Sequence, residues 1–160
     1  MKFYDYFNNY SSLIEPFKSN SNNDLNFNID SNLIEGFQAN ITSKKISLKA
    51  YNGKYLSAKD DGYLYWNSDK ISNNEIFEIE NINNKIAIKS YNNKYISALP
   101  NGEVINKNDK IDDFAHFEYK DSGDHISLNS THGKFLSVDN SGKLMNNKVN
   151  IGDSEIFQVL

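Results

Sequence analysis

The residue types in this chain that could do chemistry are lysines, histidines, acidic residues and aromatic side chains, because the chain contains no cysteine. Ser122, Asp124 and His125 supply the residue types of a nucleophilic triad, but such triads are held rigidly from separated positions, and neither G-x-S-x-G nor H-E-x-x-H occurs. The acidic run at residues 109–113 lacks the alternating oxygen ligands and the glycine of a calcium loop. We therefore expect no enzyme activity, no metal site and no cofactor.

The composition narrows the class of protein further. All 17 basic residues are lysines, and the formal charge of the 160-residue chain is −4. Without arginine there is no bidentate fork for phosphate or guanine, which argues against a binder of duplex nucleic acid. No apolar run is long enough to span a membrane, and residues 1–6 lack the apolar segment of a secretory signal. We expect a cytoplasmic protein that binds neither nucleic acid nor membranes.

From residue 46 onward the chain repeats itself three times, without gaps, at a spacing of forty residues. The shared positions include an opening isoleucine, a glycine or asparagine before a lysine, and a closing phenylalanine. These columns are Ile46, Ile86 and Ile126; Gly53, Asn93 and Gly133; Lys54, Lys94 and Lys134; and Phe77, Phe117 and Phe157. About ten columns coincide in this way, which is too many for a chance match.

Within each copy, apolar and polar residues alternate with a period of two, which predicts short, half-buried strands. A turn dipeptide separates the first two alternating runs of each copy. These dipeptides are Asn52-Gly53, Asn92-Asn93 and His132-Gly133. Asn-Gly is the signal of a two-residue hairpin turn in which both residues have positive φ. With four strands in each of three copies, the sequence predicts twelve strands.

Three equal modules of strands favour one arrangement of the chain. Six strands can close a barrel while three hairpins cap one end, and closure removes the exposed sheet edges. The apolar face of one copy is too small to bury itself, so the three copies must pack about a common axis. We expect this all-β fold for residues 46–160.

The strand that follows each turn resembles the GKYLSA element of fascin-like and hisactophilin-like β-trefoils. It reads GKYLSA at 53–58, NKYISA at 93–98 and GKFLSV at 133–138. The segments at 77–80, 117–119 and 157–159 resemble the F-x-(I/L/V)-E strand that closes each repeat of that family. The resemblance implies a β-trefoil of three repeats and a non-catalytic binding module that engages actin or another acidic cytoskeletal surface. Related trefoils bind carbohydrates, which is the alternative function.

Departures from the family limit what the resemblance implies. Position 2 is Lys2 in place of the glycine needed for myristoylation, and the chain has only three histidines, so pH-switched membrane attachment is not expected. The sole tryptophan, Trp66, has no glutamine two places before it, so the Q-x-W sugar signature of ricin-type trefoils is missing.

Residues 1–45 form an extension before the repeats. Apolar side chains recur in steps of three and four over residues 3–17, which predicts an amphipathic helix ending near Pro16. This helix would pack on an open end of the trefoil, or it would mediate homo-oligomer formation or the docking of a partner in a scaffold protein. Residues 25–41 fit either a strand or a short helix.

The lysine of each repeat is a candidate contact for an acidic partner. Lys54, Lys94 and Lys134 would lie at one end of the barrel, related by the pseudo-threefold axis, and the surface of actin is acidic. The alternative is a solvated lysine whose stem covers an aromatic neighbour.

Aromatic side chains are the candidates for stacking on a sugar ring. Tyr51 and Tyr91 precede the turns and break the apolar alternation, so we expect them to be exposed, whereas the third copy has Thr131. A second aromatic cluster, at residues 63–66, occurs in the first copy only. The complete set of candidate ligand-binding residues is Tyr51, Asn52, Lys54, Tyr65, Trp66, Tyr91, Asn93, Lys94, His132 and Lys134.

Overall fold

The computed structural model describes residues 44–160. The helix expected in the extension lies outside the described residues. No helix within the described part is long and apolar enough to cross a membrane. The strands are β1 (Lys44–Ile46), β2 (Leu48–Lys49), β3 (Tyr55–Ala58), β4 (Leu64–Ser68), β5 (Phe77–Ile82), β6 (Lys85–Ser90), β7 (Tyr95–Ala98), β8 (Val104–Asn108), β9 (Phe117–Asp121), β10 (His125–Ser130), β11 (Phe135–Val138), β12 (Leu144–Lys148) and β13 (Phe157–Val159).

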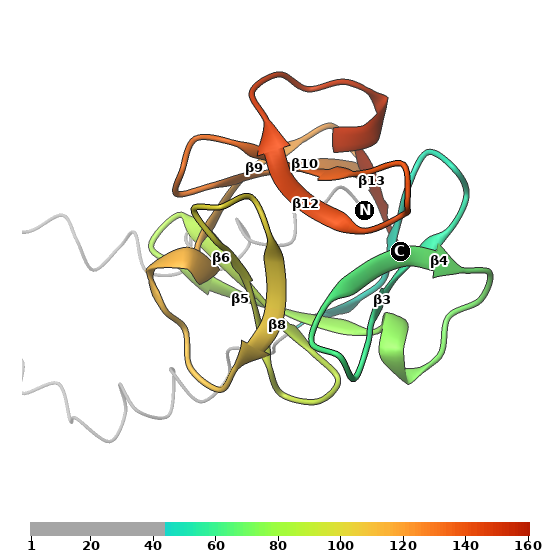
Figure 1. Ribbon diagram of the computed structural model, residues 1–160, viewed down its shortest axis with the longest axis horizontal. Coiled ribbons are helices and arrows are strands. Elements are labelled where there is room, and N and C mark those ends of the chain that lie inside the picture. Colours follow the sequence, from blue (N-terminus) through green and yellow to red (C-terminus); the bar gives the residue numbers. More distant parts are fainter. Residues whose placement is uncertain (1–43) are drawn as a thin grey trace, which may run out of the picture. The chain divides into compact units, whose positions relative to one another are not determined.

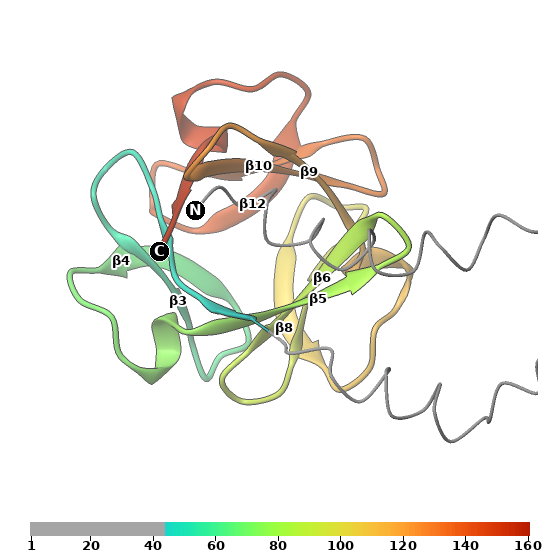
Figure 2. The same ribbon diagram turned by 180° about the vertical axis from the view of Figure 1, so that it is seen from behind.

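Six strands close a barrel, whose members lie in front in Figure 2. β1 and β2 are two segments of its first strand, broken at Ser47. Antiparallel pairing runs from β1 through β5, β6, β9, β10 and β13 and returns to β2. At the break, Ser47 and Leu160 exchange two backbone hydrogen bonds of 2.9 and 3.0 Å, so the ring of strands is complete.

Three hairpins, β3–β4, β7–β8 and β11–β12, cap one end of the barrel and lie about its centre in Figure 1. Counting β1 and β2 as one strand, the chain therefore has three lobes of four strands: lobe 1 holds β1–β5, lobe 2 holds β6–β9 and lobe 3 holds β10–β13. The expected twelve strands and the expected barrel with three hairpins are confirmed.

Backbone hydrogen bonds join the three hairpins to one another in a cycle around the axis. The N–H of Trp66 in lobe 1 donates to the carbonyl of Gly142 in lobe 3 at 2.6 Å. The other two bonds, both 2.8 Å, run from Asn106 to Gly62 and from Asn146 to Gly102. Because each donor and each acceptor occupies the same place in its repeat, this cycle fixes the pseudo-threefold arrangement of the cap.

The core is built from the alternating apolar residues of the repeats. The closing phenylalanines, Phe77, Phe117 and Phe157, are at most 1% exposed. Toward the cap, a ring of leucine and isoleucine side chains surrounds the axis together with Trp66 and Phe157, and leaves a cavity of only about 10 Å³. The interior of the barrel is therefore filled and offers no room for a ligand.

The turns after the first strand of each lobe differ from the expected form. Positive φ occurs only at the last residue of each loop, with values of 78° at Gly53, 61° at Asn93 and 69° at Gly133. The N–H of Gly53 donates to the carbonyl of Ala50 at 2.9 Å. The expected two-residue turn is therefore wrong. Each loop has three residues, in which a type I turn is followed by a residue in the left-handed conformation, and in lobe 1 this residue is Gly53. Asn52 acts as a cap, since its Oδ1 accepts from the N–H of Lys54 at 2.9 Å.

One short 3-10 turn precedes the closing strand of each lobe, and the alternation pattern did not predict it. The three turns are η2 (Asn73–Glu75), η3 (Asp113–Ala115) and η4 (Asp153–Glu155). Ser72 and Glu75 form a capping box around η2, in which Glu75 Oε2 accepts from the N–H of Ser72 at 2.9 Å. Ser72-x-x-Glu75 is a readable signal in the sequence.

Candidate functional site

The three repeat lysines are not equivalent in the structure. Lys54 forms an ion pair with Asp69, and Lys94 Nζ lies 2.5 Å from Asp109 Oδ1. The third lobe has Val149 in the place of these aspartates, and no acidic partner of Lys134 is found within residues 44–160. Two of the three expected contacts for an acidic surface are thus neutralised within their own lobes.

Other lysines cover the aromatic side chains of the strands. Lys49 Nζ lies 5.5 Å from the centre of the Tyr55 ring, and Lys89 Nζ lies 6.0 Å from that of Tyr95. Lys89 also forms ion pairs of 3.1 Å with both Glu78 and Glu80 on β5. Each of these two lysine–tyrosine contacts joins a barrel strand to the cap hairpin of the same lobe and leaves the ring half-buried.

The turn tyrosines are exposed, as expected. Tyr51 is 65% exposed and Tyr91 is 39% exposed. The hydroxyl of Tyr91 donates to Asp60 Oδ1 at 3.2 Å, which ties the turn of lobe 2 to the β3–β4 loop of lobe 1. Burial and this hydrogen bond to Asp60 raise the pKa of Tyr91. Tyr51 is the freer aromatic surface of the two.

Trp66 is not an exposed platform. It is 2% exposed and stacks on Phe157, with ring centres 4.6 Å apart. The expectation that it binds a ligand is wrong, because it points into the barrel with the alternate residues of β4. Its neighbour Tyr65 faces outward, half-buried, and donates a hydrogen bond of 3.2 Å to Asp61 Oδ2.

Tyr63 lies in the cap beside two lysines from the other lobes. Lys143 Nζ is 3.8 Å and Lys107 Nζ 4.6 Å from the centre of its ring. Lys143 also lies 3.6 Å from Glu103 Oε1. Because the Tyr63 ring contacts ammonium groups from both other lobes, it links the three hairpins of the cap.

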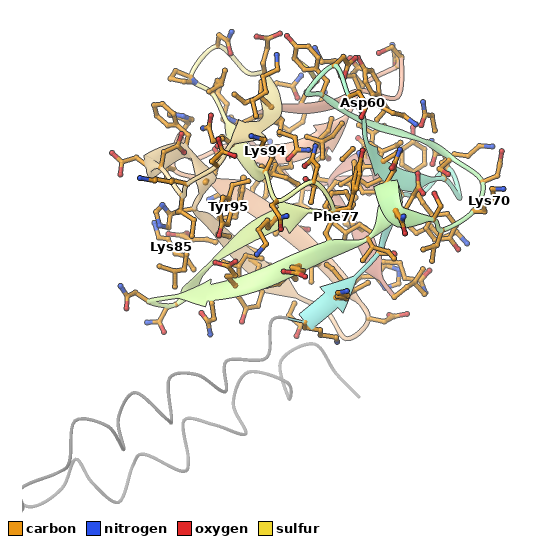
Figure 3. All side chains as sticks on the ribbon, turned by 90° about the horizontal axis from the view of Figure 1, so that it is seen from below. Asp60, Lys70, Phe77, Lys85, Lys94 and Tyr95 are labelled. Atoms are coloured by element: carbon orange, nitrogen blue, oxygen red, sulfur yellow. The ribbon has the colours of Figure 1, made fainter. Side chains whose placement is uncertain are left out.

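A hollow of about 400 Å³ lies on the outside of the molecule, between lobes 2 and 3, and Ile82 of lobe 1 also lines it. We call it the polar hollow. The free end of the β5–β6 hairpin, the turn η3 and the loop between β10 and β11 form its walls. Lys85 is one of the lining residues, and Figure 3 shows it far from Asp60 of the β3–β4 loop. The lining side chains are Ile82, Asn83, Lys85, Asp113, His116 and Thr131.

His132 fixes one wall of the polar hollow. Its Nε2 donates to the carbonyl of Ala98 at 3.1 Å, and its ring packs against Phe114, with centres 5.2 Å apart. These contacts tie the loop that carries Thr131 to lobe 2 and to η3. Of the candidate residues, His132 therefore lies beside the hollow, whereas Lys94 and Asn93 belong to a different turn.

The sequence analysis did not predict the polar hollow, although two of its residues differ in type from their equivalents in the other lobes. At the repeat position of Thr131 the other lobes carry Tyr51 and Tyr91, and at the position of His116 they carry Ile76 and Ile156. Both departures fall in one place in the structure. A comparison of the repeats for columns where one lobe is smaller or more polar would have found this site.

Each lobe also holds a carboxylate beside its 3-10 turn. Glu75 and Glu155 are each 3% exposed. Burial alone raises the pKa of both groups, but hydrogen bonds, among them those from Ser72 to Glu75 and from the N–H of Gly152 to Glu155, outweigh burial and bring each pKa below its usual value. These charged groups stabilise the turns and are not accessible to a ligand. Within Lys44–Leu160, no group of three or more histidine or acidic side chains is placed to hold a metal ion.

Comparisons with known proteins agree with this architecture. A family model described as FRG1-like domain matches residues 34–121, which is more than half of the chain. The chain belongs to the FRG1-like domain family. This match confirms the expected membership of the fascin-like β-trefoil family.

Among solved structures, that of SeviL bound to asialo-GM1 saccharide resembles this FRG1-like chain with a TM-score of 0.63. The sequences are 15% identical, and the match covers 74% of this chain and 98% of that chain. At this identity, the likeness shows the β-trefoil fold alone. A search among curated proteins gave no match.

Proposed function

We propose that this FRG1-like trefoil is a non-catalytic binding module that recognises a saccharide on its outer surface. The observation that carries the proposal is the polar hollow, whose volume of about 400 Å³ falls in the range of small-molecule sites, about 300–1,000 Å³. Its walls supply hydroxyl, amide, imidazole, ammonium and carboxylate groups beside one aliphatic side chain, Ile82.

Such a lining suits a ligand with many hydroxyl groups. Each sugar hydroxyl both donates and accepts, so it pairs with amide and hydroxyl side chains, which also do both, and with the carboxylate of Asp113 as an acceptor. Two further facts support the proposal. SeviL, which shares the fold, has a bound saccharide, and Tyr51 offers a second exposed ring.

A glycan array with the full chain tests this proposal. We expect reproducible binding to at least one saccharide class, and saturable binding of that saccharide in a calorimetric titration. A Tyr51→Ala variant separates the contribution of the exposed ring from that of the hollow, since the side chain can be removed without opening the core. An array without binders contradicts the proposal.

A second candidate function is the binding of actin or another acidic protein surface through lobe 3. Lys134 has no acidic partner within the described residues, and Lys148 lies next to it on the neighbouring strand, opposite Phe135. This pair of ammonium groups gives lobe 3 a local positive charge. In lobes 1 and 2 the equivalent lysines are neutralised by Asp69 and Asp109 of their own lobes.

Cosedimentation of the full chain with filamentous actin at low and moderate salt tests the second candidate. We expect pelleting that weakens as salt rises, and a further loss in Lys134→Ala. A protein that stays in the supernatant at both salt concentrations contradicts it. The cytoplasmic location and a role of residues 1–45 in partner binding or oligomer formation remain predictions, which cell fractionation and deletion of residues 1–43 would test.

A further inference from the structure

We infer that the polar hollow binds one neutral saccharide per trefoil, and that His116 and Thr131 are the residues that set this lobe junction apart from the other two. The inference rests on the proposed function and names the site, the charge class of its ligand and its stoichiometry.

The charges around the hollow favour a neutral ligand. Lys85 is the one lysine of the lining, and its Nζ lies 3.5 Å from Glu118 Oε1 on the neighbouring strand β9. Asp113, which is exposed, adds a carboxylate to the lining. The formal charges of Lys85, Glu118 and Asp113 sum to one negative charge, so a sialylated, sulfated or phosphorylated ligand would meet net repulsion.

The polar groups come from three separate elements of the chain, so they surround a ligand instead of presenting a single strip. Asn83 and Lys85 come from the β5–β6 hairpin, Asp113 and His116 from η3 and the residue after it, and Thr131 from the β10–β11 loop. Ile82 supplies an apolar contact for the C–H face of a sugar ring. The volume of about 400 Å³ suits a mono- or disaccharide.

The pseudo-threefold symmetry places related residues at the two other junctions, where the chemistry differs. One junction has Tyr51 and Ile156 at the positions of Thr131 and His116, and the other has Tyr91 and Ile76. An isoleucine removes the imidazole donor and acceptor, and a tyrosine is much larger than a threonine. We therefore expect a single site of this kind.

The test replaces the two distinctive residues with those that the sibling lobes carry. A His116→Ile, Thr131→Tyr variant should fold as the wild type does, because both residues are native at the equivalent positions. The matched control changes an isoleucine at another junction, Ile156→Val, at the position equivalent to His116, without creating the pair of distinctive residues there. Urea denaturation of both variants checks folding before binding is measured.

Binding is measured by calorimetric titration of the full chain with the asialo-GM1 saccharide and with each neutral saccharide that the array identifies. We expect a stoichiometry of one for the wild type and the control. For the test variant we expect an affinity about tenfold weaker or worse, as the loss of one or two hydrogen bonds predicts. Backbone amide shifts of the wild type should change at Asn83, Lys85, His116 and Thr131.

The outcomes separate this inference from the proposed function. Neutral saccharides that bind the test variant as tightly as the wild type overturn the inference and leave the proposed function intact, as does an array in which only charged glycans bind. A control variant that loses binding as severely as the test variant also overturns the inference. An array with no binders overturns both.

Discussion

Glu75 in lobe 1 and Asp112 in lobe 2 stabilise equivalent 3-10 turns, η2 and η3, although the two residues occupy positions that are not equivalent in the repeat. Glu75 Oε2 accepts from the N–H of Ser72 at 2.9 Å, and Asp112 Oδ1 accepts from the N–H of Phe114 at 3.0 Å. The residue of lobe 2 that is equivalent to Glu75 is Ala115. The carboxylate is thus kept in the lobe while its place in the sequence has moved by three residues.

The buried glutamates predict a loss of stability in acid. Because the pKa values of Glu75 and Glu155 in the folded chain lie below the ordinary value of 4.5, their ionised forms stabilise the fold above that pH. The contribution is lost as the pH falls from about 4.5 through the lower, folded pKa values. We expect the free energy of unfolding, from urea denaturation, to decrease as the pH falls below about 5.

Replacing both carboxyl groups tests this cause. The Glu75→Gln, Glu155→Gln variant should be less stable at pH 7, by about 1–3 kcal/mol for each site, because buried hydrogen-bond partners are left imperfectly paired. Its stability should also depend less on pH in the acid range. An unchanged slope between pH 5 and pH 3 would show that other groups cause the acid sensitivity.

Asn93 predicts a difference between two small substitutions. It has a φ of 61° where its siblings are Gly53 and Gly133, so a residue without a Cβ fits this place without strain. We expect Asn93→Gly to change stability by less than about 1 kcal/mol and Asn93→Ala to destabilise by about 1–2 kcal/mol. Urea denaturation of the two variants measures this. Equal stability of the two would exclude backbone strain at this position.

Trp66 predicts a fluorescence signal for folding. It is the only tryptophan, is 2% exposed and stacks on Phe157, so its emission should shift to the red on unfolding and resist quenching by iodide in the native state. Trp66→Ala should destabilise by about 3–5 kcal/mol. Trp66→Phe, which keeps an aromatic ring, should retain saccharide binding. Loss of binding in a folded Trp66→Phe variant would reopen a direct role for this residue.

Val149 predicts that an ion pair can be restored in lobe 3. The equivalent residues Asp69 and Asp109 pair with the lysines of their lobes, and Val149 is 68% exposed. We expect Val149→Asp to pair with Lys134 and stabilise by at most about 1 kcal/mol, less at high salt. The same change should weaken any salt-dependent binding to actin. Denaturation at two salt concentrations and cosedimentation measure these effects, and stability that is lowered at low salt contradicts the expected pairing.

The fold was predictable because the sequence signals that specify it occur in all three repeats. Each lobe has the same strand alternation and the same closing phenylalanine, so a strand that is unclear in one repeat can be assigned from the other two. The turn type was not predictable from Asn52-Gly53 alone, because the same dipeptide fits a two-residue turn or the end of a three-residue loop. The backbone bond from Gly53 to Ala50 decides between them.

The candidate site was less predictable, because surface chemistry depends on which residues of different repeats meet. Lys54 and Asp69 are 15 residues apart, and nothing in the local sequence pairs them. Trp66 stood out by its rarity, but the same alternation that makes β4 a strand places its side chain inside. His116 and Thr131 were informative as departures from their siblings, yet only the packing of lobes 2 and 3 brings them to one hollow.

The backbone exchange between Ser47 and Leu160 has a consequence for synthesis on the ribosome. The last strand, β13, pairs with both β2 and β10. A nascent chain that lacks residues 157–160 therefore leaves β2 and β10 with unpaired edges. Completion of the barrel therefore follows the synthesis of residues 157–160. A circularly permuted gene that links residue 160 to residue 44 and opens at Gly123 should encode a protein that folds.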